Sequence, residues 1–501
     1  MSGERPQRVT RRQALLLAGT GAIGAGVVAA GLLRDWGSPA DRQTDSGFTV
    51  PGETSAALAE PEVIGSAGGI LHATLTAAVG RVVLAGRPVE AMSYNGSVPG
   101  PTLRLRAGDR VTLDLTNRLA VGTNLHVHGV HVSPEGNSDN PFVHVNPGET
   151  FRYQYDIPQD HPAGTFWYHP HLHGMAADQL FGGLAGAIVV ERDDSAALPV
   201  ERERTLVVTD VTLDGGQVAK VSVPERMMGR EGDLVLINGQ HEPSVAMSAG
   251  ASERWRIVNA CCSRFLRLRL DGAELVQVGG DAGALAGPIP VDHVQLVPGA
   301  RAELVVRVPE AGRYPLVAAP VDRGTTGMGG MMVGPARSSD QVVTLLHVVA
   351  TGRSGPAARL PTRLADLDDL RAVEVAGERT LTLAMGMGMG HGMSFSIDGK
   401  IFAADRVDTA VRLGGVEEWT IINDSPMAHP FHLHVWPMQV VARDGRAVGG
   451  SPRWLDVVPV PAGGNVTVRV RFNDFPGRTV YHCHILDHED LGMMGVLRAI
   501  G

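Results

Sequence analysis

The chain has 501 residues, of which 44% are hydrophobic and 19% are charged, and it contains 63 glycines and 32 prolines. At roughly 150 residues per domain this length predicts about three domains, and the abundance of Gly and Pro favours short strands and tight turns over long helices. A net charge of −9, with no run of Lys or Arg beyond the first residues, excludes a nucleic-acid partner, because phosphates require a basic surface. We therefore expect an all-β protein that acts on a small partner.

Residues 1–40 are predicted to be a targeting segment and not part of the fold. Arg11 and Arg12 precede an uncharged stretch from Ala14 to Leu33, a pattern that resembles the twin-arginine signal by which bacteria export folded proteins. The same stretch is long enough to remain as a membrane anchor. We expect an exported protein that is periplasmic, cell-surface or extracellular, with both a cleaved signal and a retained anchor open.

A repeated pattern predicts one domain type in three copies. Strand-like segments end at Asn117, Asn259 and Asn423, which are separated by 142 and 164 residues. A second motif, a Pro/Gly turn followed by an alternating segment, recurs at intervals of 151 and 163 residues. Two motifs with matching periods indicate a threefold repeat. The predicted domains are residues 60–195, 200–350 and 365–501.

The three copies differ in the residues that come after the asparagine. RLAVGTNLHVHG stands after Asn117 and DSPMAHPFHLHVW after Asn423, whereas ACCSRFLRLRL, after Asn259, has no histidine. The middle copy is therefore predicted to lack a site. Cys261 and Cys262 are adjacent, where a disulfide would be strained, so we interpret them as small buried hydrophobic residues.

Four His-x-His pairs stand in the first and third copies. Side chains alternate across a strand with period two, so both members of a pair point to the same face and can reach one metal cluster. Eight imidazoles are then predicted to converge. The pairs are His126/His128, His169/His171, His432/His434 and His482/His484.

The third cysteine, Cys483, lies between His482 and His484 and must point the opposite way. With His429, His488 and Met493 it makes a set of two imidazoles, one thiolate and a thioether, which is typical of a blue-copper electron-transfer site. A Cys/His cluster can also bind zinc, but zinc needs neither the methionine nor a neighbouring histidine cluster. The other nine histidines, among them His131, His173 and His391, are interpreted as surface or supporting residues.

The motifs HVHG, WYHPHLHG, HPFHLH and HCHILDHEDLGMM, in this order, resemble those of three-domain bacterial multicopper oxidases of the laccase-like or cuprous oxidase kind. The resemblance implies three cupredoxin-like Greek-key β-sandwich domains, with a copper cluster between the first and the last and a copper-free middle domain as a spacer. It implies four copper ions: one type 1, one type 2 and a type 3 pair. The implied ligands are His429, Cys483, His488 and Met493 for type 1, His126 and His432 for type 2, and His128, His169, His171, His434, His482 and His484 for type 3.

The same resemblance implies that an electron donor is oxidised at the type 1 copper and that O2 is reduced to water at the other three. Glu489 and Asp139 resemble family acids that bring protons to the cluster, although the spacing of Asp139 differs from that in some relatives and either residue could be an exposed acid. An exported copper-binding or scaffold protein of cupredoxin fold, without oxidase turnover, is the alternative. Known scaffold members have lost ligands that this chain retains.

Two methionine-rich segments, residues 384–393 and 327–332, bear on the identity of the electron donor. Thioethers are soft ligands that prefer Cu(I), so one hypothesis is a cuprous oxidase; the segments could equally be flexible packing. A laccase-like oxidase of phenols or aromatic amines is the other hypothesis. A copper nitrite reductase would not need all four His-x-His pairs, and a copper storage protein would not need the Cys483 path.

Overall fold

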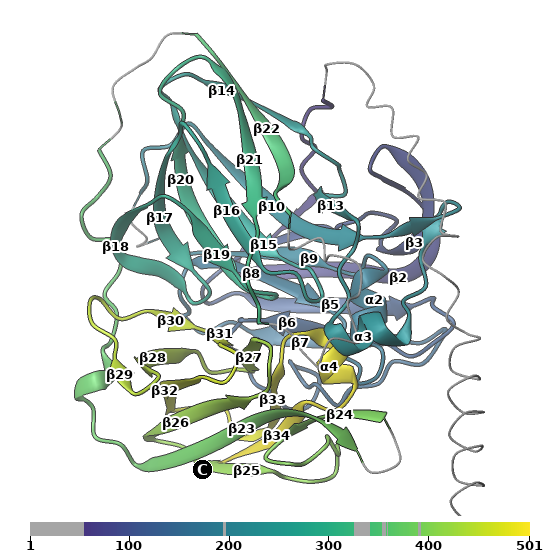
Figure 1. Cartoon of the computed structure of the whole chain (residues 1–501), viewed down its shortest axis with the longest axis vertical. Coiled ribbons are helices and arrows are strands. Elements are labelled where there is room, and N and C mark those ends of the chain that lie inside the picture. The colour runs from purple at the N-terminus through teal and green to yellow at the C-terminus, as the bar shows by residue number, and fades with distance from the viewer. Residues whose placement is uncertain (1–54, 194–196, 325–340, 353–356, 358, 389–391) are drawn as a thin grey trace, which may run out of the picture. The chain divides into compact units, whose positions relative to one another are not determined.

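The computed structural model describes residues 55–193, 197–324, 341–352, 357, 359–388 and 392–501. Six β-sheets dominate this part of the chain (Figure 1), which confirms the predicted all-β class. The helices are single turns: α2 (Ala176–Phe181), α3 (Val223–Met228), α4 (Leu486–Asp490) and the 3-10 turn Leu370–Ala372. Among the described residues, none of the helices has the length and apolar character needed to cross a membrane. The predicted signal at residues 1–40 lies outside the described part.

The first two sheets enclose a core that includes Leu71, Leu113 and Tyr153. One edge of the second sheet, β11–β12, comes from beyond residue 195, where β12 pairs in parallel with β3. The first sheet has the order β1 (Val63–Gly65), β4 (Thr102–Arg106), β9 (Gly186–Glu191), β8 (Gly164–His169), β6 (His126–His128). The second has the order β11 (Leu213–Asp214), β12 (Gln217–Val218), β3 (Arg87–Tyr94), β2 (Ile70–Leu84), β5 (Arg110–Asn117), β7 (Thr150–Asp156).

The middle part forms its own pair of sheets around Trp255 and Leu304. One has the order β13 (Leu234–Ile237), β10 (Arg202–Val211), β15 (Ser252–Asn259), β20 (Arg301–Arg307), β17 (Glu274–Gly280), β18 (Gly283–Val291). The other has the order β14 (Ser244–Ser248), β22 (Val343–Thr351), β21 (Gly312–Ala319), β16 (Leu266–Leu270), β19 (Val294–Leu296).

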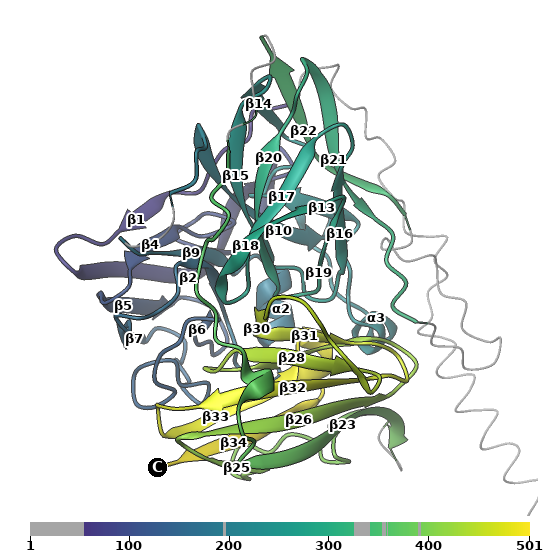
Figure 2. The same ribbon diagram turned by 90° about the vertical axis from the view of Figure 1, so that its left-hand side faces the viewer.

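The last part repeats the arrangement around Trp419 and Phe431 (Figure 2). One sheet has the order β24 (Gly392–Ile397), β23 (Gly377–Gly388), β26 (Gly415–Asp424), β32 (Asn465–Phe472), β28 (Met438–Arg443), β29 (Arg446–Ala447), with β30 (Trp454–Leu455) also on β28. The other has the order β25 (Thr409–Arg412), β34 (Met494–Ile500), β33 (Gly477–Cys483), β27 (His429–Leu433), β31 (Val457–Val460).

The same strand pairings recur in all three parts and confirm the repeat. A parallel neighbour and an antiparallel neighbour flank β5, β15 and β26, the three strands that carry the repeated asparagine. In the middle part β16, with the sequence LRLRL, holds the position that β6 and β27 hold in the other two. The absence of histidine from the middle copy is therefore a difference within one common architecture. The domain boundaries remain predictions.

The repeated asparagines stabilise the loops that follow β5, β15 and β26. Each is fully buried, and its amide nitrogen donates to two or more backbone carbonyls while its amide oxygen accepts a hydrogen bond two residues further on. The carbonyls are those of Val121 and Val145 for Asn117, Arg264 and Leu296 for Asn259, and Met427, Val460 and Pro461 for Asn423.

We predict that Asn259→Ala destabilises the protein by about 1–3 kcal/mol, because it leaves buried carbonyls without donors. The measurement is the free energy of unfolding by denaturant, followed by tryptophan fluorescence. The exposed Asn146→Ala is the control and should change this free energy by less than about 0.5 kcal/mol. Equal effects of the two substitutions would contradict a structural role for Asn259.

Candidate metal centre

The four His-x-His pairs lie where strands of the first and last parts end. Across the sheets, His126 is opposite His169, and His432 is opposite His482. Only the pair on β6 lies wholly within a strand, since β8, β27 and β33 each end before the second histidine. Three of the four pairs thus lie at the ends of their strands, yet all eight imidazoles are buried together.

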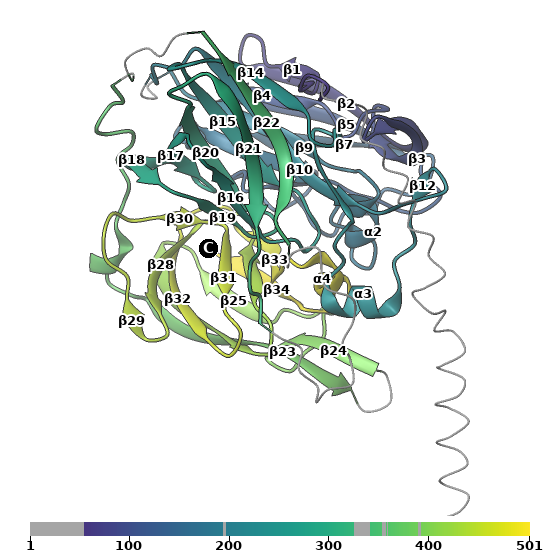
Figure 3. The ribbon, with the colours of Figure 1, turned by 45° about the horizontal axis from the view of Figure 1, so that its top comes forward.

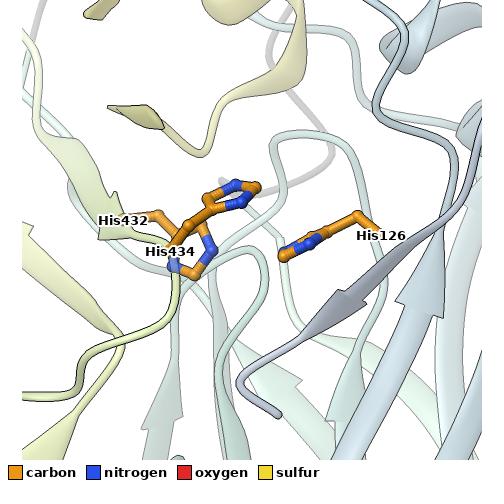
Figure 4. Close-up of side chains that lie close together, drawn as sticks. All are labelled: His126, His432 and His434. Atoms are coloured by element: carbon orange, nitrogen blue, oxygen red, sulfur yellow. The ribbon is translucent and has the colours of Figure 1, made fainter. Parts of the chain in front are cut away.

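Rings from the two ends of the chain interleave in this cluster. The imidazole of His126 stacks on that of His434 with centroids 3.9 Å apart, and His128 stacks on His432 at 4.0 Å. Figure 4 shows His126 approaching His432 and His434 from the opposite side. The first and last parts are both needed to build this site.

Protein acceptors hold one nitrogen of several rings and so fix which nitrogen faces inward. The Nδ1 atoms of His169, His432 and His482 lie 2.7–3.0 Å from the backbone carbonyls of Pro170, Asp456 and Cys483. A carbonyl only accepts, so the ring proton must be on Nδ1 and the lone pair on Nε2. An orienting partner of this kind is typical of metal-binding histidines.

Within the described part of the chain, ring nitrogens of six of these histidines are buried without a hydrogen-bond partner. An unpaired nitrogen lone pair in a buried site is unfavourable, and a bound metal ion would satisfy it. The atoms are His126 Nε2, His128 Nδ1, His169 Nε2, His432 Nε2, His434 Nδ1 and both ring nitrogens of His484.

The spacing of the rings suits more than one metal ion. The Nε2 atom of His482 lies 3.1 Å from that of His171 and 3.2 Å from that of His434. Two nitrogens about 2.0 Å from one ion lie about 3.3 Å apart at a tetrahedral angle. The rings of His128, His169 and His484 form a second group with centroids 4.9–5.8 Å apart, and ligand atoms of His126, His432 and His434 form a third.

Burial keeps these rings in the form that binds metals. It lowers the pKa of His126, His128 and His434 well below the ordinary value, and lowers that of His169 to about 3 and that of His171 to about 4. Neighbouring imidazoles add to the effect by mutual repulsion. Neutral imidazole is the metal ligand, so the cluster is ready to bind cations at neutral pH.

A second donor set lies on the other side of Cys483. Its Sγ atom is 3.3 Å from His429 Nδ1 and 3.9 Å from His488 Nδ1, and the two Nδ1 atoms are 3.3 Å apart. The outer nitrogens are held by Ser425 Oγ at 2.8 Å from His429 and by the Met227 carbonyl at 3.3 Å from His488.

Met493 and the chemistry of the thiol complete the second set. Met493 is fully buried, and its carbonyl accepts from the Cys483 amide at 3.1 Å. Burial raises the pKa of Cys483, so a thiolate there requires an adjacent cation. A buried cysteine, two imidazoles and a buried methionine whose backbone is hydrogen-bonded to that cysteine fit copper, as predicted from the sequence.

The two donor sets share the backbone of Cys483. Its thiol joins one set, while the imidazoles of its neighbours His482 and His484 join the other. The Cys483 carbonyl also accepts from His482 Nδ1 at 3.0 Å, which adds a hydrogen-bonded link to the covalent one.

Both predicted acids touch the histidine cluster, and neither is exposed. Glu489 Oε2 lies 3.0 Å from His482 Nδ1; burial raises the pKa of this carboxyl, but the facing imidazoles of His171 and His482 outweigh burial and lower it to about 2. Both oxygens of Asp139 lie 3.0 Å from His126 Nδ1, and burial raises the pKa of Asp139 to about 8.

The short helices α2 and α3 both contact α4, which also contacts β33 (Figure 3). Asp487 of α4 forms an ion pair with the buried Arg230, at 2.6 Å. Asp490 accepts from the backbone amides of Gly174 and Ala177 at 2.8 and 2.9 Å, which fixes the start of α2. These contacts join α4 to segments of the first and middle parts, and no spacing in the sequence indicates them.

A cavity of about 170 Å³ adjoins the histidine cluster. Gly129 and Val435, which directly follow His128 and His434, line it together with Trp436, Trp454 and Asp456.

The remaining candidates have other environments. His131 is half-buried against Asp474, and Cys261 and Cys262 are buried free thiols, in keeping with a packing role. His391, Met389 and residues 325–340 with their methionines lie outside the described residues. Sequence reasoning missed Ser425, Met227 and Asp456, whose contacts come from distant segments.

Three family models described as multicopper oxidase match residues 76–195, 204–334 and 374–500. A solved structure, a metallo-oxidase from Campylobacter jejuni, is 32% identical in sequence and has a TM-score of 0.79. The match covers 89% of this chain and 96% of the Campylobacter chain. A laccase from Bacillus stratosphericus is 27% identical over 81% of this chain and 90% of the relative. The cell division protein FtsP of Xenorhabdus nematophila is 28% identical over 82% and 85%.

One histidine outside both donor sets should make stability depend on pH. Burial lowers the pKa of His161 to about 4, so this ring stays neutral while the unfolded chain takes up a proton below pH 6.5. Stability should therefore fall as the pH decreases from 6.5 to 4, by about 1.4 kcal/mol per pH unit for this group.

We predict that His161→Gln flattens this dependence, as measured by denaturant unfolding of the copper-loaded protein at a series of pH values. The exposed His293→Gln is the matched control and should follow the wild type. A His161 variant with the wild-type slope would show that another group causes the acid sensitivity.

Proposed function

The chain belongs to the multicopper oxidase family, and we propose that it couples one-electron oxidation of a small donor to four-electron reduction of O2 to water. The family assignment implies oxidoreductase chemistry with copper and three domains of the cupredoxin type, as the sequence predicted. The observation that carries the proposal is the position of Cys483, with its thiol in one donor set and both neighbouring imidazoles in the other.

The two donor sets divide four copper ions between them in this proposal. When bound, copper would accept single electrons beside Cys483 and bind and reduce O2 in the histidine cluster. We assign type 1 copper to His429, Cys483, His488 and Met493 and type 2 to His126 and His432. The type 3 pair takes two groups, His171, His434 and His482 as one and His128, His169 and His484 as the other.

The residues between the sets provide the electron path. Cys483 passes electrons from its thiol through its own backbone to His482 and His484. The hydrogen bond from His482 Nδ1 to the Cys483 carbonyl, at 3.0 Å, shortens one branch. Since the whole path is buried, water does not compete for its polar groups.

Two acids transfer protons to the cluster in the proposed reaction. The Glu489 carboxylate is placed to accept a proton next to His482 and His171, from which it lies 3.0 and 3.5 Å away. Asp139 holds His126 through Nδ1 and so keeps Nε2 turned inward. We propose that the Glu489 carboxylate relays protons to the cluster by taking up a proton and passing it on, with Asp139 as a second acid that also orients a ligand.

Cu(I) is the first donor to test and aromatic compounds are the second. His488 is fully buried, and its outer nitrogen contacts the Met227 carbonyl of α3, where Met227 and Met228 are half-buried. A covered imidazole favours a small donor over a bulky phenol. In the strand pair β23–β24, Met387 is opposite Met393 in the register. The similarity to a metallo-oxidase supports Cu(I), and the similarity to a laccase supports phenols.

We also propose that the protein is exported, because Arg11 and Arg12 precede an uncharged stretch of signal type. Export would put the enzyme where it meets extracellular donors. The similarity to FtsP keeps a second function open, an exported scaffold without turnover. A scaffold function has to explain why twelve copper-binding side chains remain in place.

The function is tested by oxygen uptake of the copper-loaded protein with Cu(I) and, separately, with a simple diphenol. The variant changes Met385, Met387, Met389 and Met393 to Leu, which keeps volume and removes the thioethers. We expect Cu(I) to be the better donor and the variant to lose that activity selectively. Preference for the diphenol, with an unaffected variant, would assign the protein to the laccases.

Two controls separate these outcomes from the scaffold function. Cys483→Ser should consume no oxygen with either donor, because the electron path begins at the thiol. Copper content of the wild type is measured in the same samples. A protein that binds fewer than four coppers after full loading and consumes no oxygen would support the scaffold.

We predict that Glu489→Gln slows oxygen reduction by about 10²–10⁴-fold while the blue absorption of the type 1 copper stays unchanged. The amide keeps the shape of the side chain but can neither take up a proton nor pass one on. The measurement is the rate at which the fully reduced protein is reoxidised by O2. The exposed Glu378→Gln is the control, and unchanged reoxidation of the Glu489 variant would remove this residue from the proton path.

A further inference from the structure

One guanidinium of the middle part contacts all three parts of the molecule next to the histidine cluster. Arg301 is fully buried at the start of β20, and each of its five side-chain N–H groups has an acceptor. The Asp456 carboxylate takes two of them, each at 2.6 Å, in a bidentate pair. The other three go to the backbone carbonyls of Thr165, Gly299 and Asp281 at 3.1, 3.1 and 2.5 Å.

Asp456 in turn contacts two cluster ligands. Its Oδ1 atom lies 3.1 Å from His128 Nε2, and its backbone carbonyl accepts from His432 Nδ1 at 2.7 Å. A carboxylate paired with a guanidinium only accepts, so the ring proton of His128 must be on Nε2. The inward atoms are then His128 Nδ1 and His432 Nε2, and both are buried without a partner among the described residues.

Removing either partner of the Arg301–Asp456 ion pair destabilises the protein. Asp456 and Arg301 are both buried, and a buried charge that loses its partner destabilises a protein by several kcal/mol. Without Arg301, the His128 ring would be the remaining hydrogen-bond partner of the Asp456 carboxylate among the described residues. It would then turn away or compete for the imidazole proton, and the His128 ring would no longer have a fixed orientation.

The backbone packs closely against this pair and against the neighbouring ring of His484. A Cβ on Gly129, the residue after His128, would lie within 2.4 Å of both Arg301 Nη2 and Asp456 Oδ2. A Cβ on Gly299 would lie 2.9 Å from the His484 ring. The turn from Gly299 to Arg301 therefore lies against the cluster beside two of its ligands, His128 and His484.

Arg301 also supports the strand that carries a third ligand. Its Nε atom donates to the Thr165 carbonyl of β8, and its guanidinium lies over the Phe166 ring at 5.7 Å. β8 ends at His169. The same side chain thus restrains a segment of the first part as well as Asp456 of the last.

We propose that Arg301 is a positioning residue of the copper cluster, which through Asp456 fixes the ring orientation of His128 and the inward nitrogen of His432. The middle part is then more than a spacer, because it supplies the charge that holds ligands of the other two parts. The proposal rests on the proposed function, since it concerns copper bound by the cluster.

The test compares Arg301→Met and Arg301→Lys with the wild type, all loaded with copper. Loss of an orienting partner should weaken copper binding at the cluster by about 10–100-fold, measured by competition with a chelator. The electron paramagnetic resonance spectrum of the type 2 copper should change, while the blue absorption of the type 1 copper stays. Arg301→Lys keeps the charge but not the two-pronged contact, so it should lose less affinity and still alter the spectrum.

Arg204→Met is the matched control, because Arg204 is a buried arginine of the same domain whose carboxylate partner is Glu253, at 2.6 Å. It should lower thermal stability without changing cluster copper. If Arg301→Met does not fold, Asp456→Asn replaces it and should show the same selective loss.

Two results would overturn the proposal: wild-type copper affinity and spectrum in the Arg301 variants, or parallel loss of type 1 and cluster copper, which would indicate a general folding defect. Failure of the proposed function gives a different result, because the wild type itself would then bind no copper at the cluster.

Discussion

Eight buried imidazoles face one another, and several of their nitrogens have no hydrogen-bond partner among the described residues. Burying unpaired nitrogens is unfavourable, and the surrounding structure determines how they can be satisfied. Desolvation disfavours the charged rings, and the pKa values of the cluster fall accordingly. The neutral rings still need partners for their lone pairs, and cations provide them. Each outward contact, to a backbone carbonyl or to a carboxylate, decides which nitrogen is left for the metal. The supporting shell is thus as much a part of the site as the rings.

The geometry of one strand end separates two sites that share a backbone. Period-two alternation turns the Cys483 thiol away from its neighbours, and α4 then returns His488 toward that thiol. Three acids in this short segment would repel one another if they were free. Instead Asp487 pairs with Arg230, Glu489 faces His482, and Asp490 binds the start of α2. The turn that positions His488 is therefore fixed by charges from other parts of the chain.

Much of the fold and of the ligand set could be predicted because the relevant signals are local or periodic. His-x-His spacing, the strand asparagines and the blank middle copy all depend on residues a few positions apart, or on one repeat length. The side chains that orient the rings carry no such signal. Arg301 and Asp456 are 155 residues apart and meet only because two domains pack together. The Met227 carbonyl beside His488 is a backbone group, so no residue type could have indicated it.

The middle domain shows why a copy without ligands can still be needed for a metal site. It has the architecture of the repeat, but β16 occupies the position that the histidine-bearing strands β6 and β27 occupy in the other two copies. Its Pro/Gly turn, the motif that recurs in all three copies, is the element that carries Arg301 and Gly299 to the cluster. A site built only from the two outer domains would leave the Asp456 carboxylate buried beside a neutral imidazole, which favours loss of the carboxylate charge or movement of the ring. A fixed guanidinium removes both options, since it satisfies the carboxylate through both oxygens and directs its remaining donors to backbone that cannot move away.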